Sequence, residues 1–279
     1  MMNKRIWGLA AVAALAALAA VPASAHRQWM MPSSTVVSGD DVWVTVDAAV
    51  SNDLFYFEHQ PMRLDAMKAW APDGTEAAIE NKSTGRYRST FDVRLTQRGT
   101  WRIGSATDML LGSYELNGKT ERLPRGTTAA NLAERLPAGA TNVKTAEANN
   151  RNEIFVTVGE PTTGLFKSTG KGIELAPVTH PNDLFSGEAA TFQFLLDGKP
   201  AAGLPVTVIP GGIRYRDQLG QMDLTTDAEG KVAVTWPEPG MYWLNVTTPQ
   251  VEREEGEGGA PPPPARRASY VTTLEVLAP

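Results

Sequence analysis

The three histidines are the residues of this chain best suited to chemistry, and each stands in a distinct context. His26 follows Ala-Ser-Ala, His59 ends the aromatic stretch LFYFEH, and His180 precedes a proline. Imidazole is the commonest metal-binding side chain, and a nitrogen-rich set of ligands suits Cu(II), Ni(II) or Zn(II). In a chain without cysteine, these side chains predict a site for a divalent transition metal ion (nickel, cobalt, copper or zinc).

Residues 1–25 have the three parts of a secretory signal peptide. Lys4 and Arg5 precede an apolar run of 16 residues, and small residues follow up to Ala25. About 20 apolar residues are needed to cross a bilayer, so this run is short for a membrane anchor. We therefore expect cleavage after Ala25, release into the periplasm without a membrane-spanning segment, and a mature chain that begins with His26.

A histidine in first position offers two nitrogens to one ion. A free α-amino group has an ordinary pKa of about 8, low enough to release its proton to a metal near neutral pH. With the imidazole it forms a chelate like the histidine brace of some secreted copper proteins, and His59 and His180 would complete the site. Both also have ordinary readings: His59 as a histidine hydrogen-bonded to the backbone, and His180 as a residue that shapes a strand entrance before proline.

Composition and motifs exclude several classes of function. The formal charge of −5 becomes −7 when Lys4 and Arg5 are removed, and an acidic chain is a poor partner for nucleic acid. The sequence has no cysteine nucleophile, no G-x-S-x-G, no P-loop and no G-x-G-x-x-G motif, so we expect no enzyme. The catalytic alternative is an oxidative enzyme that uses a histidine-brace copper ion.

Short alternating apolar runs bounded by turn residues predict an all-β fold that positions the histidines. We expect two immunoglobulin-like or prealbumin-like β-sandwich domains, at 26–160 and 173–279, joined by a hinge at 159–172. The best helix candidate is brief, at 128–136. The charged, Gly-rich and Pro-rich segment 248–269 predicts a mobile loop between the last two strands, with a docking arm for a partner as the alternative.

Aromatic residues at alternating positions are expected in the core. In the stretch RYRSTFDVRLT, the inward residues would be Tyr87, Phe91, Val93 and Leu95. We also assign the tryptophans to the core, with a carbohydrate platform as the alternative; they are Trp29, Trp43, Trp70, Trp101, Trp236 and Trp243.

Three stretches of the sequence match a known family: AHRQWMMPSSTVVSGDDVWVTVDAA, the more specific STGKGIELAPVTHPNDLFSGEAATFQFLLDGKPAAGLPVTVIPGG, and TTDAEGKVAVTWPEPGMYWLNV. They resemble the NikM-like periplasmic proteins (domain of unknown function 4198), a family often labelled the periplasmic component of a cobalt or nickel transport system. The similarity covers nearly all of residues 26–279. It implies a secreted all-β protein linked to transition-metal uptake or sensing, and it places His26 and His180 within matched motifs.

The expected function is therefore that of a soluble periplasmic protein that binds a divalent transition metal. It would serve as an accessory or carrier for a membrane metal transporter or receptor. The alternative is a structural or interaction module that binds a protein or a glycan in the cell envelope.

Overall fold

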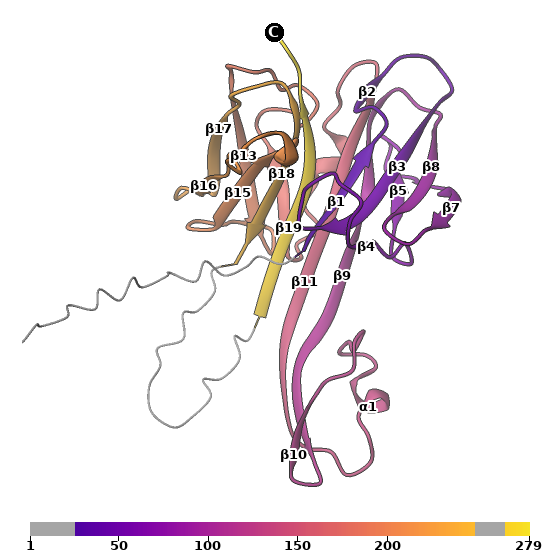
Figure 1. The fold of residues 1–279 in the computed structure, drawn as a ribbon, viewed down its shortest axis with the longest axis vertical. Helices are drawn as coiled ribbons and strands as arrows, with labels where there is room; N and C mark the ends of the chain where they lie inside the picture. Colours follow the sequence, from indigo (N-terminus) through magenta and orange to yellow (C-terminus); the bar gives the residue numbers. More distant parts are fainter. Residues whose placement is uncertain (1–25, 249–265) are drawn as a thin grey trace, which may run out of the picture.

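The computed structural model describes residues 26–248 and 266–279, which form three β-sheets (Figure 1). The predicted signal peptide and residues 249–265 of the predicted loop lie outside the described residues. The all-β prediction is confirmed. In the described ranges there is one turn of α-helix, α1 (Leu132–Arg135), and it lies within the stretch predicted to be helical. There are also two short 3-10 helices, η1 (Gly164–Phe166) and η2 (Ile213–Tyr215). No described helix is long and apolar enough to cross a membrane.

The first sheet has the strand order β1-β3-β8-β7, and β4 also pairs with β3. Its strands are β1 (Arg27–Pro32), β3 (Val42–Ser51), β4 (Gln60–Pro61), β7 (Glu80–Thr84) and β8 (Ser89–Leu95).

The second sheet has ten strands in the order β16-β15-β18-β19-β11-β9-β5-β6, with β10 beside β9 and β2 beside β11. Its strands are β2 (Val36–Val37), β5 (Lys68–Trp70), β6 (Glu76–Ala77), β9 (Gly99–Leu116), β10 (Lys119–Arg122), β11 (Thr141–Val158), β15 (Pro205–Pro210), β16 (Met222–Thr225), β18 (Gly240–Thr247) and β19 (Arg266–Val276). The third sheet has the order β12-β13-β14 with β17 beside β13. Its strands are β12 (Ile173–Pro177), β13 (Ala189–Leu196), β14 (Lys199–Pro200) and β17 (Lys231–Thr235).

Two hydrophobic cores define two sandwiches. The first sheet packs on the β5, β9 and β11 part of the second sheet, around side chains such as Val46, Phe91 and Ile154. The third sheet packs on the β15, β18 and β19 part, around side chains such as Phe192 and Tyr270. The cores form because alternate side chains of each strand point inward, so apolar residues at every second position share one face.

The two sandwiches share the ten-stranded sheet rather than meeting only through a hinge. β19 pairs in parallel with β11, from Arg266 beside Glu147 to Thr272 beside Glu153. The predicted hinge at 159–172 is also tied down, because the Glu174 carboxylate accepts hydrogen bonds from the backbone N–H groups of Thr169 and Gly170. These hydrogen bonds hold the end of the connection against β12, the first strand of the second sandwich.

The predicted core residues are mostly, but not all, buried. Phe91, Val93 and Leu95 are buried as expected, whereas Tyr87 lies outside β8 and is 43% exposed. Four tryptophans (Trp29, Trp101, Trp236 and Trp243) are buried, and Trp70 is half-buried. Trp43 is 46% exposed, because it alternates with Val44 and Val46 in β3 and so points to the outer face of the sheet.

β9 and β11 pair along nearly their whole length of 18 residues each and project beyond both sandwiches (Figure 1). The connection between them carries β10 and α1. Leu111 and Val143, on the projecting part, are 42% and 39% exposed. The sequence reasoning did not foresee this arm.

A third, smaller core joins the two sandwiches near the start of β1. It contains Trp29, Ala49 and Leu54 from the first sandwich, with Ile209 and Trp243 from the second. The Trp243 indole Nε1–H donates to the Gln28 carbonyl oxygen at 2.9 Å. This junction supports the loop at 52–59, between β3 and β4, on which His59 lies.

Candidate metal site

The structure brings His26 and His59 into direct contact. Their rings are stacked, with centroids 3.7 Å apart and planes inclined by 10°. The contact follows from the sheet, because β1 and β4 flank β3 on either side: Gln28 and Gln60 both lie beside Val50. His26 comes just before β1 and His59 just before β4, so both histidines lie at the end of β3. Both side chains are exposed.

The stacked geometry of the two imidazoles is not itself a metal-binding geometry. A metal lies in the plane of the ring that binds it, about 2.0–2.1 Å from the nitrogen, so two parallel rings cannot both hold one ion as they stand. Both side chains are exposed to solvent, which leaves their rings free to reorient. With the α-amino group of a processed His26, the pair offers three nitrogens, a donor set that fits Cu(II), Ni(II) or Zn(II).

The loop at 52–59 is held by the residue next to His59. One carboxylate oxygen of Glu58 accepts hydrogen bonds from the backbone N–H groups of Asn52 and Asp53, at 2.9 and 2.8 Å. The other accepts from Arg214 of the second sandwich at 2.8 Å. Burial acts to raise the pKa of Glu58, but the Asp53 N–H, Arg214 and the Asn52 N–H outweigh it, and the pKa is lowered. Glu58 is therefore ionised near neutral pH, and its carboxylate oxygens are occupied by hydrogen bonds that hold the loop.

His180 lies elsewhere. Its Nε2 is 3.0 Å from the Thr100 hydroxyl, which in turn contacts the Thr157 hydroxyl. The Thr157 N–H donates to the carbonyl of Thr35, which follows β1, whereas His26 precedes it. The six residues of β1 span about 20 Å at about 3.3 Å per residue, so His180 cannot share an ion with His26 in this fold.

The nitrogens of His180 are also already engaged. Nδ1 accepts a hydrogen bond from the Asn182 backbone N–H at 3.1 Å, and Nε2 lies 3.3 Å from the Thr162 carbonyl oxygen. This pattern fits a neutral ring with its proton on Nε2. The expected three-histidine cluster is thus not formed, and in residues 26–248 and 266–279 no three His, Cys, Asp or Glu side chains converge as a metal site.

The position of His180 predicts a pH dependence of stability. Burial lowers its pKa, opposed by the hydrogen bond to Thr162 and the charge of Asp183, so the unfolded chain takes up a proton at a higher pH than the folded protein does. Stability should therefore fall as the pH drops below about 6.5, the ordinary value for histidine. His180→Asn, which keeps an acceptor near the Asn182 N–H, should flatten the unfolding free energy between pH 6.5 and 5.5 in urea titrations. An unchanged slope would contradict this assignment.

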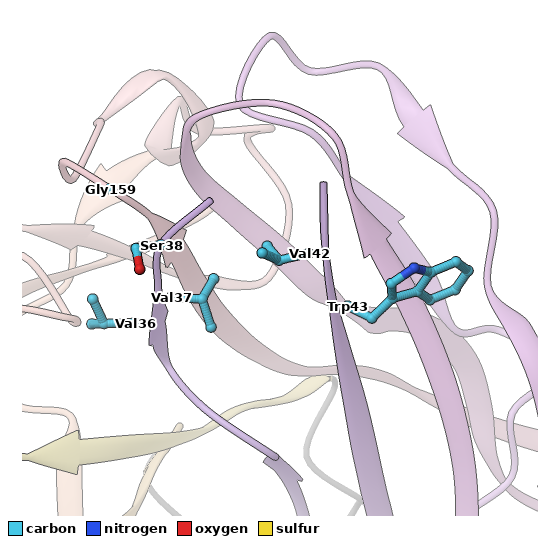
Figure 2. A pocket seen from close by; sticks show the side chains of 6 residues that line it. All are labelled: Val36, Val37, Ser38, Val42, Trp43 and Gly159. Atoms are coloured by element: carbon cyan, nitrogen blue, oxygen red, sulfur yellow. The ribbon is translucent and has the colours of Figure 1, made fainter. Parts of the chain in front are cut away.

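A separate shallow pocket lies at the other end of β1, between β2 and the start of β3. Figure 2 shows its lining: Val36, Val37, Ser38, Val42, Trp43 and Gly159. Its volume is about 570 Å³, but none of these side chains is a metal ligand. The histidine pair is therefore the better candidate site.

Sequence reasoning identified His26 and His59 but not Arg214, which holds the loop of His59 through Glu58. Glu58 stands next to His59 in the sequence and draws attention for that reason. Arg214 is 156 residues from Glu58, and nothing in its local sequence marks it. Only the shared sheet and the junction core bring the two together.

The fold and the site define an all-β, two-sandwich protein with an exposed histidine pair at the junction. A sequence model of the family described as "Domain of unknown function (DUF4198)" matches residues 23–250, and the chain belongs to this family. The family description names no metal. A search of the curated proteins gave no match.

Solved structures with some similarity to this chain include two fragments of intimin. The D0-D1 domain is 13% identical, with a TM-score of 0.22, and the match covers 88% of this chain and 97% of that one. The D00-D0 domain is 10% identical, with a TM-score of 0.21, covering 90% and 100%. Escherichia coli alpha-2-macroglobulin activated by porcine elastase is 12% identical, with a TM-score of 0.21, covering 90% and 31%. At such TM-scores these similarities carry no argument about function.

Proposed function

We propose that the processed protein binds one divalent transition metal ion with the amino group and ring of His26 and the ring of His59. It would act in the periplasm as a carrier or accessory protein for metal uptake, passing the ion to a membrane transporter or receptor. The observation that carries the proposal is the contact between two histidine rings from segments 33 positions apart in a chain with three histidines.

The exposure of the pair favours a transported ion over a structural one. Both rings are accessible to solvent, and the flanking strands are paired and buried independently of any metal. Structural metal sites are enclosed by a full set of protein ligands, whereas an ion held by few exposed ligands can be passed on. No covalent step on a substrate is required, which keeps the proposal outside enzyme chemistry.

The test is a titration of Ni(II), Cu(II) and Zn(II) into the processed protein and its His26→Ala variant. Loss of the His26 ring should weaken binding at least tenfold, about 1.4 kcal/mol, by calorimetry. His180→Asn is the matched control, and its affinity should equal that of the unaltered protein. Equal affinities for the processed protein and His26→Ala would remove the chelate from the account.

The projecting arm favours a second candidate, a structural or interaction module of the cell envelope. Its exposed Leu111 and Val143 are the kind of apolar surface that contacts a partner. A chain with all three histidines replaced by alanine would then keep its native partner, which a pull-down from the cell envelope can show.

A further inference from the structure

The loop that carries His59 is closed on itself by a single side chain. The Glu58 carboxylate accepts two backbone N–H bonds, from Asn52 and Asp53, at the opposite end of the loop. The residue after His26 reaches the same point, because the Arg27 guanidinium donates to the Asn52 carbonyl at 2.9 Å. The side chains next to the two histidines, Arg27 and Glu58, therefore both bond to the backbone at residues 52–53.

The second sandwich fastens this loop with one guanidinium group. Arg214, in η2, donates through Nε to Asp53 at 3.0 Å and through Nη2 to Glu58 at 2.8 Å. Its guanidinium also lies over the ring of Tyr56, 4.2 Å from the centroid. A planar fork that bridges two carboxylates of one loop restricts where that loop can stand.

The contacts of Arg214 with Asp53 and Glu58 contribute more to the position of the loop than to the stability of the fold. The Arg214 side chain is 45% exposed, and half-exposed ion pairs contribute little to folding. The strands on either side of the loop are already fixed by β-pairing, and the apolar side chains of Phe55 and Phe57 pack on Trp29. What remains for Arg214 is the orientation of the end of the loop, where His59 faces His26.

We infer that Arg214 is a positioning residue of the metal site: through Glu58 and Asp53 it fixes the loop that presents His59 to His26. The second sandwich thereby sets the affinity of a site whose ligands all belong to the first. This inference rests on the proposed function. It also means that any partner that displaces Arg214 from the loop weakens the hold on the ion, which is a route to its release.

The experiment uses Cu(II) as the probe and the processed protein as the material. Pulsed electron paramagnetic resonance counts the imidazoles bound to Cu(II), and calorimetry gives the affinity. Arg214→Gln should bind Cu(II) about 10–100-fold more weakly and show fewer than two bound imidazoles per ion on average, since His26 keeps its chelate while His59 is no longer held against it. Arg214→Lys keeps the positive charge but loses the forked guanidinium group. Its affinity for Cu(II) should lie between that of Arg214→Gln and that of the unaltered protein.

Arg94→Gln is the matched control. Arg94 forms an equally well-made fork with Asp41, at 2.7 and 2.6 Å, with a similarly exposed side chain on the first sheet. It should keep two imidazoles and the original affinity. A general loss of stability would act alike in both variants, whereas a positioning role moves the imidazole count only in Arg214→Gln.

The outcomes separate this inference from the proposed function. Two imidazoles and unchanged affinity in Arg214→Gln, with one imidazole in His59→Ala, would overturn the positioning role and leave the metal site standing. The same spectrum for His59→Ala and the unaltered protein would overturn the proposed site itself, and the positioning role with it.

Discussion

A chain that keeps Pro22 to Ala25 in front of His26 should bind Ni(II) more weakly than the processed chain by more than about a hundredfold, about 2.7 kcal/mol. The added residues turn the α-amino group of His26 into a backbone amide, which holds its proton and is not a ligand near neutral pH. Changes to residues that merely orient a ligand already cost about 10–100-fold in affinity, so loss of a ligand should cost more. Calorimetry on the two purified chains measures the difference.

The control for this prediction is the same extension in a His59→Ala background. If amine and ring act on one ion, the extended His59→Ala chain should have lost nearly all of its affinity. Equal affinity for Ni(II) in the extended and the processed chain would show that the amino group takes no part, and the proposal would lose one of its three ligands.

The second large effect concerns the junction on which the site is built. Trp29→Ala should lower the free energy of unfolding by about 3–5 kcal/mol, the usual cost of truncating a buried aromatic residue. Trp29 is fully buried, packs on the rings of Phe55 and Phe57, and donates from Nε1 to the Ser51 hydroxyl at 2.8 Å. Urea unfolding followed by circular dichroism checks this value.

Trp43→Ala is the matched control, because it removes the same type of side chain from a position where the tryptophan is 46% exposed. Its effect should stay below about 1 kcal/mol, as for most surface substitutions. A comparable loss of stability in both variants would mean that the junction core contributes no more than the outer face of the first sheet. In that case the support of the His59 loop must come from elsewhere.

Much of the fold follows from local patterns in the sequence. Alternation in VWVTVDAAV predicts a strand with one buried face, and Val44 and Val46 are buried as that pattern requires. Turn residues between short apolar runs predict the sandwiches, and each run carries its own signal. The brief helix is also a local feature, and the structure has one turn of it at α1.

What the sequence did not reveal depends on long-range pairing. The parallel pairing of β19 with β11 unites residues more than 100 positions apart, and no local pattern encodes it. The same holds for Arg214 on Glu58. Trp43 shows the limit of assigning residues by type, because its phase in β3 places it outside although tryptophan is usually well buried.

The histidines show both sides of this limit. His59 meets His26 because both adjoin strands that flank β3, a local consequence of a three-stranded arrangement. His180 resembled them in type, but its neighbours Thr100 and Asn182 bind both of its nitrogens at the other end of β1. Residue type gave three candidates, and only the placement of the strands selects two of them.

The most direct test of the metal site is anomalous X-ray diffraction from crystals of the processed protein grown with Ni(II). We predict one strong nickel peak about 2.0–2.1 Å from a ring nitrogen of His26 and from a ring nitrogen of His59, with the His26 amino nitrogen as a further ligand. A nickel peak away from this pair, or none on well-ordered His26 and His59 side chains, would contradict it.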